Sequence, residues 1–310
     1  MKYTVSALLA LLMIFSLCAC GQPARTSDGF TVVCTTFPLY DFTRNIVGET
    51  DGVRVKLLME NGSDLHNFRP AAAQILQIQN ADLFIYNGGE SDEWVDDLSL
   101  DDVKTLAAVD LCRTLVEEDV EGAAHEEEEH EEEEEIDEHV WLSLSRAAEI
   151  CTGICDALSA ANAENADVYA ANAAAYKAER STLDASYREA LATTGERVLV
   201  VCDRFPFRYL AEDYGLHCFA AFSGCSAESE ASFETVLNLA NALDKYKLDR
   251  VYVLEGSDKK IAETVVGTAA MKDVEILTLN SMQSVTAADV KGGATYLSIA
   301  KANLEILKAN

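Results

Sequence analysis

NADVYAANAAAYKAERSTLDASYREALA, residues 165–192, is the stretch of sequence that decides the fold. It contains no Gly or Pro and ten of its residues are Ala, which predicts one helix of roughly 28 residues, about 42 Å long. Gly195 and Glu196 end it. A helix of this length usually connects two parts of a chain, so we assign residues 165–193 to a linker helix.

The segments before the linker helix predict one α/β lobe over residues 30–164. Runs rich in β-branched and aromatic residues alternate with runs of helical spacing. We expect strands at 30–36, 53–59 and 81–86, and helices at 71–79 and 144–158. Strands that alternate with helices indicate a parallel sheet covered on both faces.

The segments after the linker helix predict a second unit of the same kind over residues 194–310. We expect strands at 197–202, 218–222, 250–255 and 275–279, and helices at 207–214, 233–246, 259–271 and 293–308. The predicted fold class is therefore α/β, with two Rossmann-like lobes of parallel strands joined by a single long, rigid α-helix. Ligands of open α/β sheets bind at the carboxyl ends of the strands. Two such lobes facing each other make a cleft between them, which is a common place for a ligand site.

The first 20 residues have the features of an export signal. Lys2 precedes an apolar run, residues 5–17, that is too short to span a bilayer comfortably. The run ends in Leu17-Cys18-Ala19-Cys20, which resembles the lipobox of bacterial lipoproteins. This predicts a signal peptide over residues 1–20, a lipidated Cys20, a tether over residues 21–29, and a protein outside the cytoplasm that is lipid-anchored to the cell membrane. The alternative is an ordinary signal peptide with a chance cysteine.

About half of the net charge of −29 comes from one segment. Residues 117–138 hold 15 acidic side chains and no basic ones. An excess of negative charge argues against nucleic acid and against an anionic membrane face as electrostatic partners. Such a density of like charge predicts a solvated loop without regular structure.

Seven cysteines follow Cys20, at positions 34, 112, 151, 155, 202, 218 and 225. A compartment outside the cytoplasm permits disulfides, but an odd number leaves at least one cysteine unpaired or paired between chains. None has the spacing of a structural zinc site. They are interpreted as small core residues or as one to three disulfides.

Histidine is scarce, and two of the five histidines lie in predicted loops of the first lobe. His66 follows a predicted strand, and His139 lies at the exit of the acidic segment. A neutral imidazole is a good ligand for zinc, copper, nickel and iron. Because a lone histidine in a loop is more often structural, spacing alone favours a metal site only modestly.

Motifs along most of the mature chain resemble those of the solute-binding proteins of ATP-binding-cassette (ABC) importers for zinc and manganese. Gly62-x-Asp64-x-His66-x-Phe68-x-Pro70 resembles the first ligand loop of that family, and Glu138-His139-Val140-Trp141-Leu142 resembles its second ligand motif. Residues 35–42, 81–94 and 207–216 resemble its opening strand, its next strand and loop, and its interlobe helix. The resemblance implies two α/β lobes joined by a long helix, with an ion held between them.

The resemblance assigns His66 and His139 as the metal ligands of the first lobe. In the second lobe, Arg204 stands where the family usually has His or Glu and cannot ligate, and Asn280 stands near a position where the family often has Asp. Our candidates for extra oxygen ligands are Asp203 and then Glu255. The alternative for Asp203 is an ion pair with Arg204 or Arg208. Glu230 is a further carboxylate in a loop expected to reach the cleft.

The resemblance implies a metal-binding, non-enzymatic protein that captures Zn²⁺ with high affinity and delivers it to an ABC importer permease and ATPase. Mn²⁺ or iron is the alternative cargo, because histidine and carboxylate ligands accept these ions as well. Zinc proteins of the family often carry an acidic, His-rich loop before the second ligand, so His125 and His130 are predicted to capture metal weakly. We expect a monomer with no nucleic-acid partner. An extracellular metallohydrolase or an adhesin is a competing class, but no H-E-x-x-H motif or repeat supports either.

Overall fold

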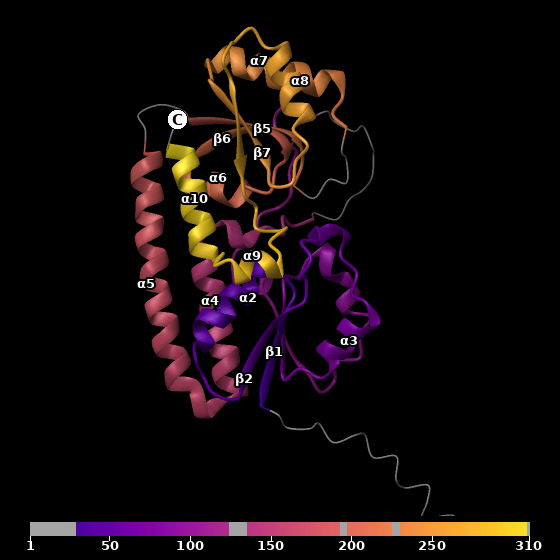
Figure 1. Cartoon of the computed structure of the whole chain (residues 1–310), viewed down its shortest axis with the longest axis vertical. Helices are drawn as coiled ribbons and strands as arrows, with labels where there is room; N and C mark the ends of the chain where they lie inside the picture. Colours follow the sequence, from indigo (N-terminus) through magenta and orange to yellow (C-terminus); the bar gives the residue numbers. More distant parts are fainter. Residues whose placement is uncertain (1–28, 124–134, 193–196, 225–229, 309–310) are drawn as a thin grey trace, which may run out of the picture.

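The computed structural model describes residues 29–123, 135–192, 197–224 and 230–308. Two α/β lobes are stacked along the long axis of the molecule (Figure 1), and each contains one four-stranded sheet in which every pairing is parallel. The two sheets have equivalent strand orders, β2-β1-β3-β4 and β6-β5-β7-β8. The predicted fold class is confirmed.

The first lobe is built around two apolar strands. Its strands are β1 (Phe30–Cys34), β2 (Val53–Leu57), β3 (Leu83–Tyr86) and β4 (Lys104–Ala107). The central strands β1 and β3 are almost wholly buried, whereas the edge strand β2 has partly exposed residues. This is the pattern of a parallel sheet covered on both faces.

Helices cover the sheet of the first lobe and connect its strands to loops near the other lobe. The α-helices are α2 (Phe37–Val47), α3 (Ala72–Gln79) and α4 (Leu144–Ala161). Short 3₁₀ turns are η1 (Leu65–Asn67), η2 (Glu90–Val95), η3 (Val109–Leu111), η4 (Val140–Leu142) and η5 (Ala163–Asn165). The turn η1 contains His66, and His139 directly precedes η4.

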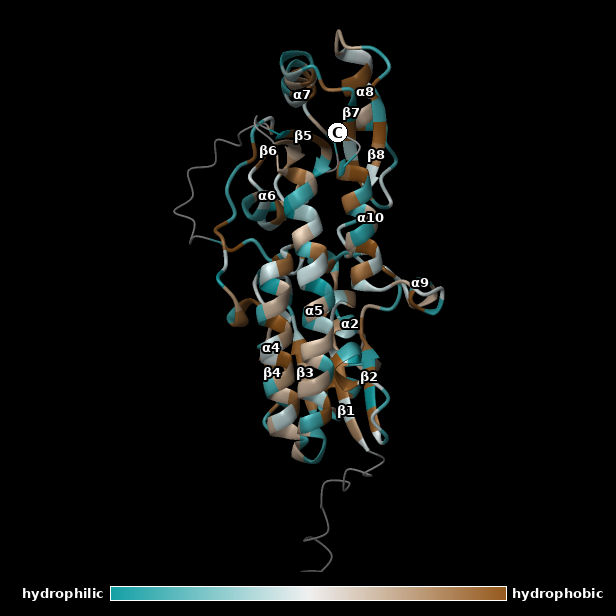
Figure 2. Cartoon of the chain, turned by 90° about the vertical axis from the view of Figure 1, so that its left-hand side faces the viewer, coloured by the Kyte–Doolittle hydropathy of each residue, from teal (hydrophilic) through white to brown (hydrophobic). Residues whose placement is uncertain are grey.

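The linker is the 26-residue helix α5 (Ala166–Leu191). Its fully buried side chains include Tyr169, Tyr176, Tyr187 and Leu191, which fall on one stripe of a helix. The stripe packs on α2 and α4, and both α4 and α5 carry hydrophilic and hydrophobic residues along their length (Figure 2). Helix α5 also contacts α6 (Arg208–Tyr214) and α10 (Tyr296–Lys308), so it packs against elements that precede it and elements that follow it in the chain.

The second lobe repeats the architecture of the first. Its strands are β5 (Arg197–Arg204), β6 (Leu216–Phe222), β7 (Arg250–Leu254) and β8 (Glu275–Leu279). Its helices are α6 (Arg208–Tyr214), α7 (Phe233–Tyr246) and α8 (Lys260–Thr268). Some of the buried residues of this lobe form a separate apolar cluster around α7, α8 and neighbouring strands, and others belong to the larger core that both lobes share.

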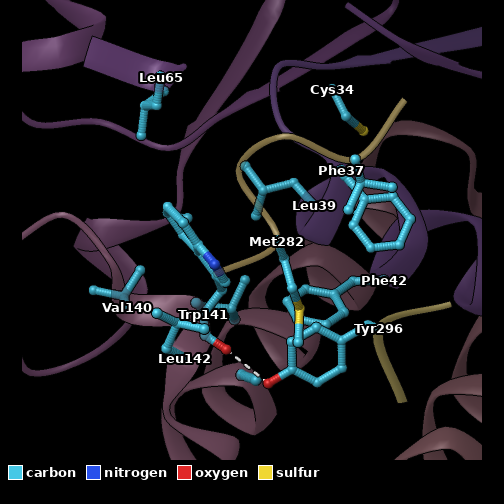
Figure 3. Close-up of a cluster of buried hydrophobic side chains, with 14 of the residues drawn as sticks. Cys34, Phe37, Leu39, Phe42, Leu65, Val140, Trp141, Leu142, Met282 and Tyr296 are labelled. Carbon is cyan, nitrogen blue, oxygen red and sulfur yellow. Dashed lines mark hydrogen bonds between the residues drawn. The ribbon is translucent and has the colours of Figure 1, made fainter. Parts of the chain in front are cut away.

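The end of the chain returns to the first lobe. After α9 (Ala287–Lys291), helix α10 (Tyr296–Lys308) runs beside α5 and also contacts α2 (Figures 1 and 2). The Tyr296 hydroxyl donates to the Trp141 carbonyl (2.6 Å), inside a cluster that also contains Phe42 and Met282 (Figure 3). The largest apolar core therefore contains residues from both lobes.

The predicted elements lie where the structure has them, with ends that differ by a few residues. The edge strand β4 was missed, because Lys-Thr-Leu-Ala has neither an apolar run nor a clear alternation. The last helix begins at Tyr296, three residues later than expected at Gly293. No helix in the described ranges has the length and apolar character that crossing a membrane requires.

Candidate metal site

The first histidine is held in a short turn that follows β2. Gly62 adopts a positive φ of 68°, which glycine tolerates best, and opens the turn. Asp64 caps η1 by accepting the backbone N–H of His66 at 3.1 Å. On the imidazole, Nδ1 lies 2.8 Å from the Ser91 hydroxyl oxygen. The ring is thereby fixed from the backbone side and from one of its nitrogens.

The second histidine directly precedes η4 and is fully buried. One oxygen of Asp137 accepts both the backbone N–H of His139 (2.8 Å) and its ring Nδ1–H (3.0 Å). The Tyr209 hydroxyl in turn donates to the Asp137 carbonyl. Gly224 lies so close that a Cβ there would sit 3.3 Å from Cε1 of His139. The ring is therefore held by groups from both lobes.

The two imidazoles face each other with their centroids 5.3 Å apart and an interplanar angle of 58°. Nε2 of His66 and Nε2 of His139 are both buried and have no hydrogen-bond partner. When Nδ1 carries the proton and is bound to Ser91 or Asp137, Nε2 is left with a free lone pair. Two buried imidazole nitrogens without partners, on rings this close together, are suitable ligands for a transition-metal ion.

The surroundings of the two histidines shift their pKa values in opposite directions. Burial, the nearby His139 and the Arg204 guanidinium lower the pKa of His66 to about 4. Burial also acts to lower the pKa of His139, but the Asp137 carboxylate outweighs it, so the pKa is raised. His66 is therefore neutral at neutral pH and available as a ligand.

The carboxyl group of Glu138 lies beside the imidazole ring of His66. Glu138 is 1% exposed. One of its carboxylate oxygens accepts the backbone N–H of Ser91 at 2.7 Å. The other oxygen has no hydrogen-bond partner and lies 3.9 Å from Nδ1 of His66. Burial raises the pKa of Glu138 to about 7. Gly89, with φ of 82°, makes room for this carboxylate, since a Cβ there would lie 2.4 Å from its oxygen.

The two acidic candidates of the second lobe lie in a cavity of about 530 Å³ between the lobes. Asp203 accepts the backbone N–H groups of Arg204 (3.0 Å) and Leu254 (3.3 Å). Glu255 accepts the backbone N–H and the hydroxyl of Ser281 at 2.7 and 2.8 Å. Asp64 lines the same cavity, so the cavity reaches the His66 turn.

Other positions considered from the sequence have different roles. Arg204 forms an ion pair with Asp64 rather than with Asp203. The Asn280 side chain accepts the Met282 N–H at 2.7 Å, which shapes the loop after β8. Glu230 is exposed. Within the described ranges, no three His, Cys, Asp or Glu side chains are grouped closely enough to hold an ion in this conformation.

Several predicted residues cannot be placed. His125, His130, Cys20 and Cys225 lie outside the described residues. The six described cysteines after Cys20 are free thiols, and Cys34, Cys151 and Cys202 are buried. Within the described chain these three are core residues, whereas Cys112, Cys155 and Cys218 are half-buried thiols.

The chain matches the family model for ZnuA, zinc-uptake complex component A, periplasmic, over residues 32–310. The chain belongs to this family. It is 34% identical to the zinc-binding lipoprotein AdcA of Streptococcus pneumoniae over 98% of its own length and 60% of that protein. It is 30% identical to the high-affinity zinc uptake system protein ZnuA of Bacillus subtilis over 93% of its own length and 89% of that protein.

Solved structures agree with the sequence comparison. The Zn(II)-bound ZnuA-like domain of Streptococcus pneumoniae AdcA matches with a TM-score of 0.72 and 32% identity, covering 91% of this chain and 98% of that domain. The laminin-binding protein of Streptococcus agalactiae shares the fold, with a TM-score of 0.74 at 24% identity. The chain spans only about 60% of the curated AdcA relatives.

Some of the residues that shape the site were missed by the sequence analysis. Asp64 and Asp137 each stand two positions before a candidate ligand histidine, and this repeated Asp-x-His unit is a signal that could have been found. Ser91 is distant in sequence and has no such signal. It reaches His66 only because η2 folds beside η1.

Proposed function

We propose that this chain captures a zinc ion with His66 and His139 and delivers it to an ABC importer. The observation that carries the proposal is the pair of facing imidazoles whose Nε2 atoms are buried without partners. Leaving two such nitrogens unpaired in a protein interior costs free energy unless a ligand takes them up. Their second nitrogens are already bound to Ser91 and Asp137, the usual arrangement around a metal-ligating histidine.

Zinc is the proposed cargo, and manganese is the alternative. Two imidazole nitrogens completed by oxygen donors suit tetrahedral zinc. Manganese prefers a shell richer in oxygen, which the buried pair does not by itself supply. The family description and the names of the relatives, which specify zinc, support the same choice.

We further propose that Asp203, and then Glu255, supply oxygen ligands from the second lobe. Both line the interlobe cavity that Asp64 also lines. Each now binds backbone or hydroxyl groups of its own lobe, so ligation requires a local rearrangement of those loops. X-ray absorption at the zinc edge tests this. Asp203→Ala should remove one oxygen neighbour from the wild-type shell, and an unchanged shell would exclude Asp203.

Family membership supports our proposal for the partners and the location. The proposed partners are the importer's permease and ATPase, and the protein is proposed to act outside the cytoplasm as a monomer anchored by lipid on Cys20. Replacement of Cys20 by Ala should release the protein from the membrane fraction into the medium or periplasm, as immunoblotting of the fractions would show. Retention of that variant in the membrane would contradict lipid anchoring at this residue.

Direct titration tests the metal site. His66→Ala and His139→Ala should each weaken zinc binding by at least about 100-fold, because each removes one of few ligands. Competition with a fluorescent zinc chelator measures the change. His217→Ala is the matched control, since His217 lies in the edge strand β6 of the second lobe and pairs with Glu121 rather than with either site histidine. Tight binding retained in the double His66→Ala/His139→Ala variant would place the site elsewhere, and a clear preference for Mn²⁺ would overturn the choice of zinc.

A further inference from the structure

The two turns that carry His66 and His139 contain the same hydrogen bond between a side chain and the backbone. In Asp64-Leu65-His66 and in Asp137-Glu138-His139, one carboxylate oxygen of the aspartate accepts the backbone N–H of the histidine two residues later. Such local turns are typical of aspartate. In both cases this oxygen is Oδ1, so the second oxygen, Oδ2, points elsewhere.

Each Oδ2 faces an arginine of the other lobe. Asp64 forms an ion pair with the Arg204 guanidinium, which lies at the end of β5. Oδ2 of Asp137 lies 3.6 Å from Nε of Arg208, the first residue of α6. Two arginines four positions apart in the second lobe therefore meet the two aspartates that orient the ligands in the first lobe.

The surroundings of the arginines favour a positioning role. Arg208 is 16% exposed and also donates to the carbonyl of Glu118, so its head group is held on two sides. Asp137 is 1% exposed, and removing its cation would leave a buried carboxylate with less compensation. A guanidinium keeps its charge and a fixed planar geometry at all physiological pH values.

We propose that Arg204 and Arg208 are positioning residues for the zinc site. They fix Asp64 and Asp137, which in turn orient His66 and His139. The second lobe thus contributes to binding through two guanidinium groups, whether or not it supplies a ligand. Because both contacts cross between the lobes, separation of the lobes loosens both histidines at once. This inference rests on the proposed zinc-binding function.

The competing explanation is that these ion pairs only hold the lobes together. Arg113 provides the comparison, because its guanidinium also spans the lobes, pairing with Glu212 of α6, and contacts neither aspartate. A purely adhesive role predicts that Arg113→Ala, Arg204→Ala and Arg208→Ala alter stability alone. A positioning role predicts that only the last two alter zinc affinity.

The experiment measures zinc affinity by chelator competition and stability by urea unfolding for the full mature chain. Arg204→Ala and Arg208→Ala should each weaken binding by about 10-fold or more, the usual effect of removing a group that orients a metal ligand. Arg113→Ala should leave affinity unchanged. Arg204→Lys should recover part of the loss, since it keeps the charge without the planar fork. It also serves as the test at this position if Arg204→Ala fails to fold.

A double-mutant cycle separates positioning from general electrostatics. Asp64→Asn keeps an acceptor for the His66 N–H but removes the charge that Arg204 meets. If Arg204 acts through Asp64, Arg204→Ala should add little to the affinity loss of Asp64→Asn. Wild-type affinity in folded Arg204→Ala and Arg208→Ala variants would overturn the inference and leave the zinc function intact. Absence of zinc binding by the wild-type chain would overturn both.

Discussion

At the scale of single residues, the site depends on carboxylates placed where burial makes their charge costly. Asp92 is 2% exposed, and its Oδ2 accepts the backbone N–H groups of Asn87 (2.8 Å) and Gly88 (3.0 Å). It thereby shapes the loop that carries Ser91 to His66. Burial raises the pKa of Asp92 to about 6.

This shift predicts a pH dependence of stability. Between about pH 4 and 6 the folded protein holds a proton on Asp92 that the unfolded chain has released, so the free energy of unfolding falls as pH rises through this window. Asp92→Asn removes the effect. From pH 4 to pH 7, the stability of the variant relative to wild type should therefore rise by roughly 2–3 kcal/mol.

Urea unfolding at the two pH values measures this difference. Asp97→Asn, the same change at an exposed position nearby, is the control. Parallel pH profiles for Asp92→Asn and wild type would show that Asp92 ionises in the folded protein as it does in the unfolded chain.

At the scale of elements, the two ends of the acidic segment pair with each other where the segment leaves the first lobe. We call this pairing of residues 115–117 with residues 135–137 the neck. Val116 and Ile136 form an antiparallel bridge, the Glu117 N–H donates to the Glu135 carbonyl (2.8 Å), and the Asp137 N–H donates to the Leu115 carbonyl (2.9 Å). The neck fixes the chain directly before His139. Changes beyond it can therefore be made without disturbing the ligand turn.

The neck makes the capture role of the acidic segment testable. Replacing residues 124–134 with a Gly/Ser sequence of equal length should leave one tight zinc site and remove the weaker ones, because the carboxylates together with His125 and His130 offer shifting low-affinity sites. Calorimetry gives the stoichiometry. A His125→Ala/His130→Ala variant separates imidazoles from carboxylates, and a stoichiometry equal to that of wild type after the full replacement would exclude capture by this segment.

The elements and the site differ in how much of them the sequence predicts. Apolar runs such as Leu83–Tyr86 and the long helix around Tyr176 were predicted because their patterns are local. His66 and His139 were predicted as a pair from motifs, and the structure brings them together. The partner of Arg204 was not predictable, because Asp64 lies 140 positions away and the contact exists only once the lobes are stacked.

At the scale of the whole molecule, the lobes share more than the linker helix. The carboxylate of Asp41, which is fully buried in α2, accepts from the Tyr176 hydroxyl of α5 (3.2 Å) and from the Tyr296 N–H of α10 (3.1 Å). The Tyr187 hydroxyl donates to the Ala300 carbonyl at 2.6 Å. Helices α2, α5 and α10 are thus joined by buried hydrogen bonds across the boundary between the lobes.

These contacts predict that the lobes unfold together. Both tryptophans lie in the first lobe, so their fluorescence reports on it, whereas labelling of the buried Cys202 thiol reports on the second. The two probes should give one urea midpoint. Tyr296→Phe, which removes the hydrogen bond to Trp141, should lower the free energy of unfolding by about 1–2 kcal/mol at both probes. Two separate midpoints in the wild type would show that the lobes are independent folding units.

The hydrogen bond between Asp41 and Tyr296 also limits the order in which the parts of the protein can fold. The two residues are 255 positions apart in the chain, yet the helix that begins at Tyr296 closes over the side of the first lobe. While the chain emerges from a ribosome or an export channel, this side of the first lobe stays uncovered until residues 296–308 have been delivered. Termination before this helix would therefore damage the part of the protein that was made first.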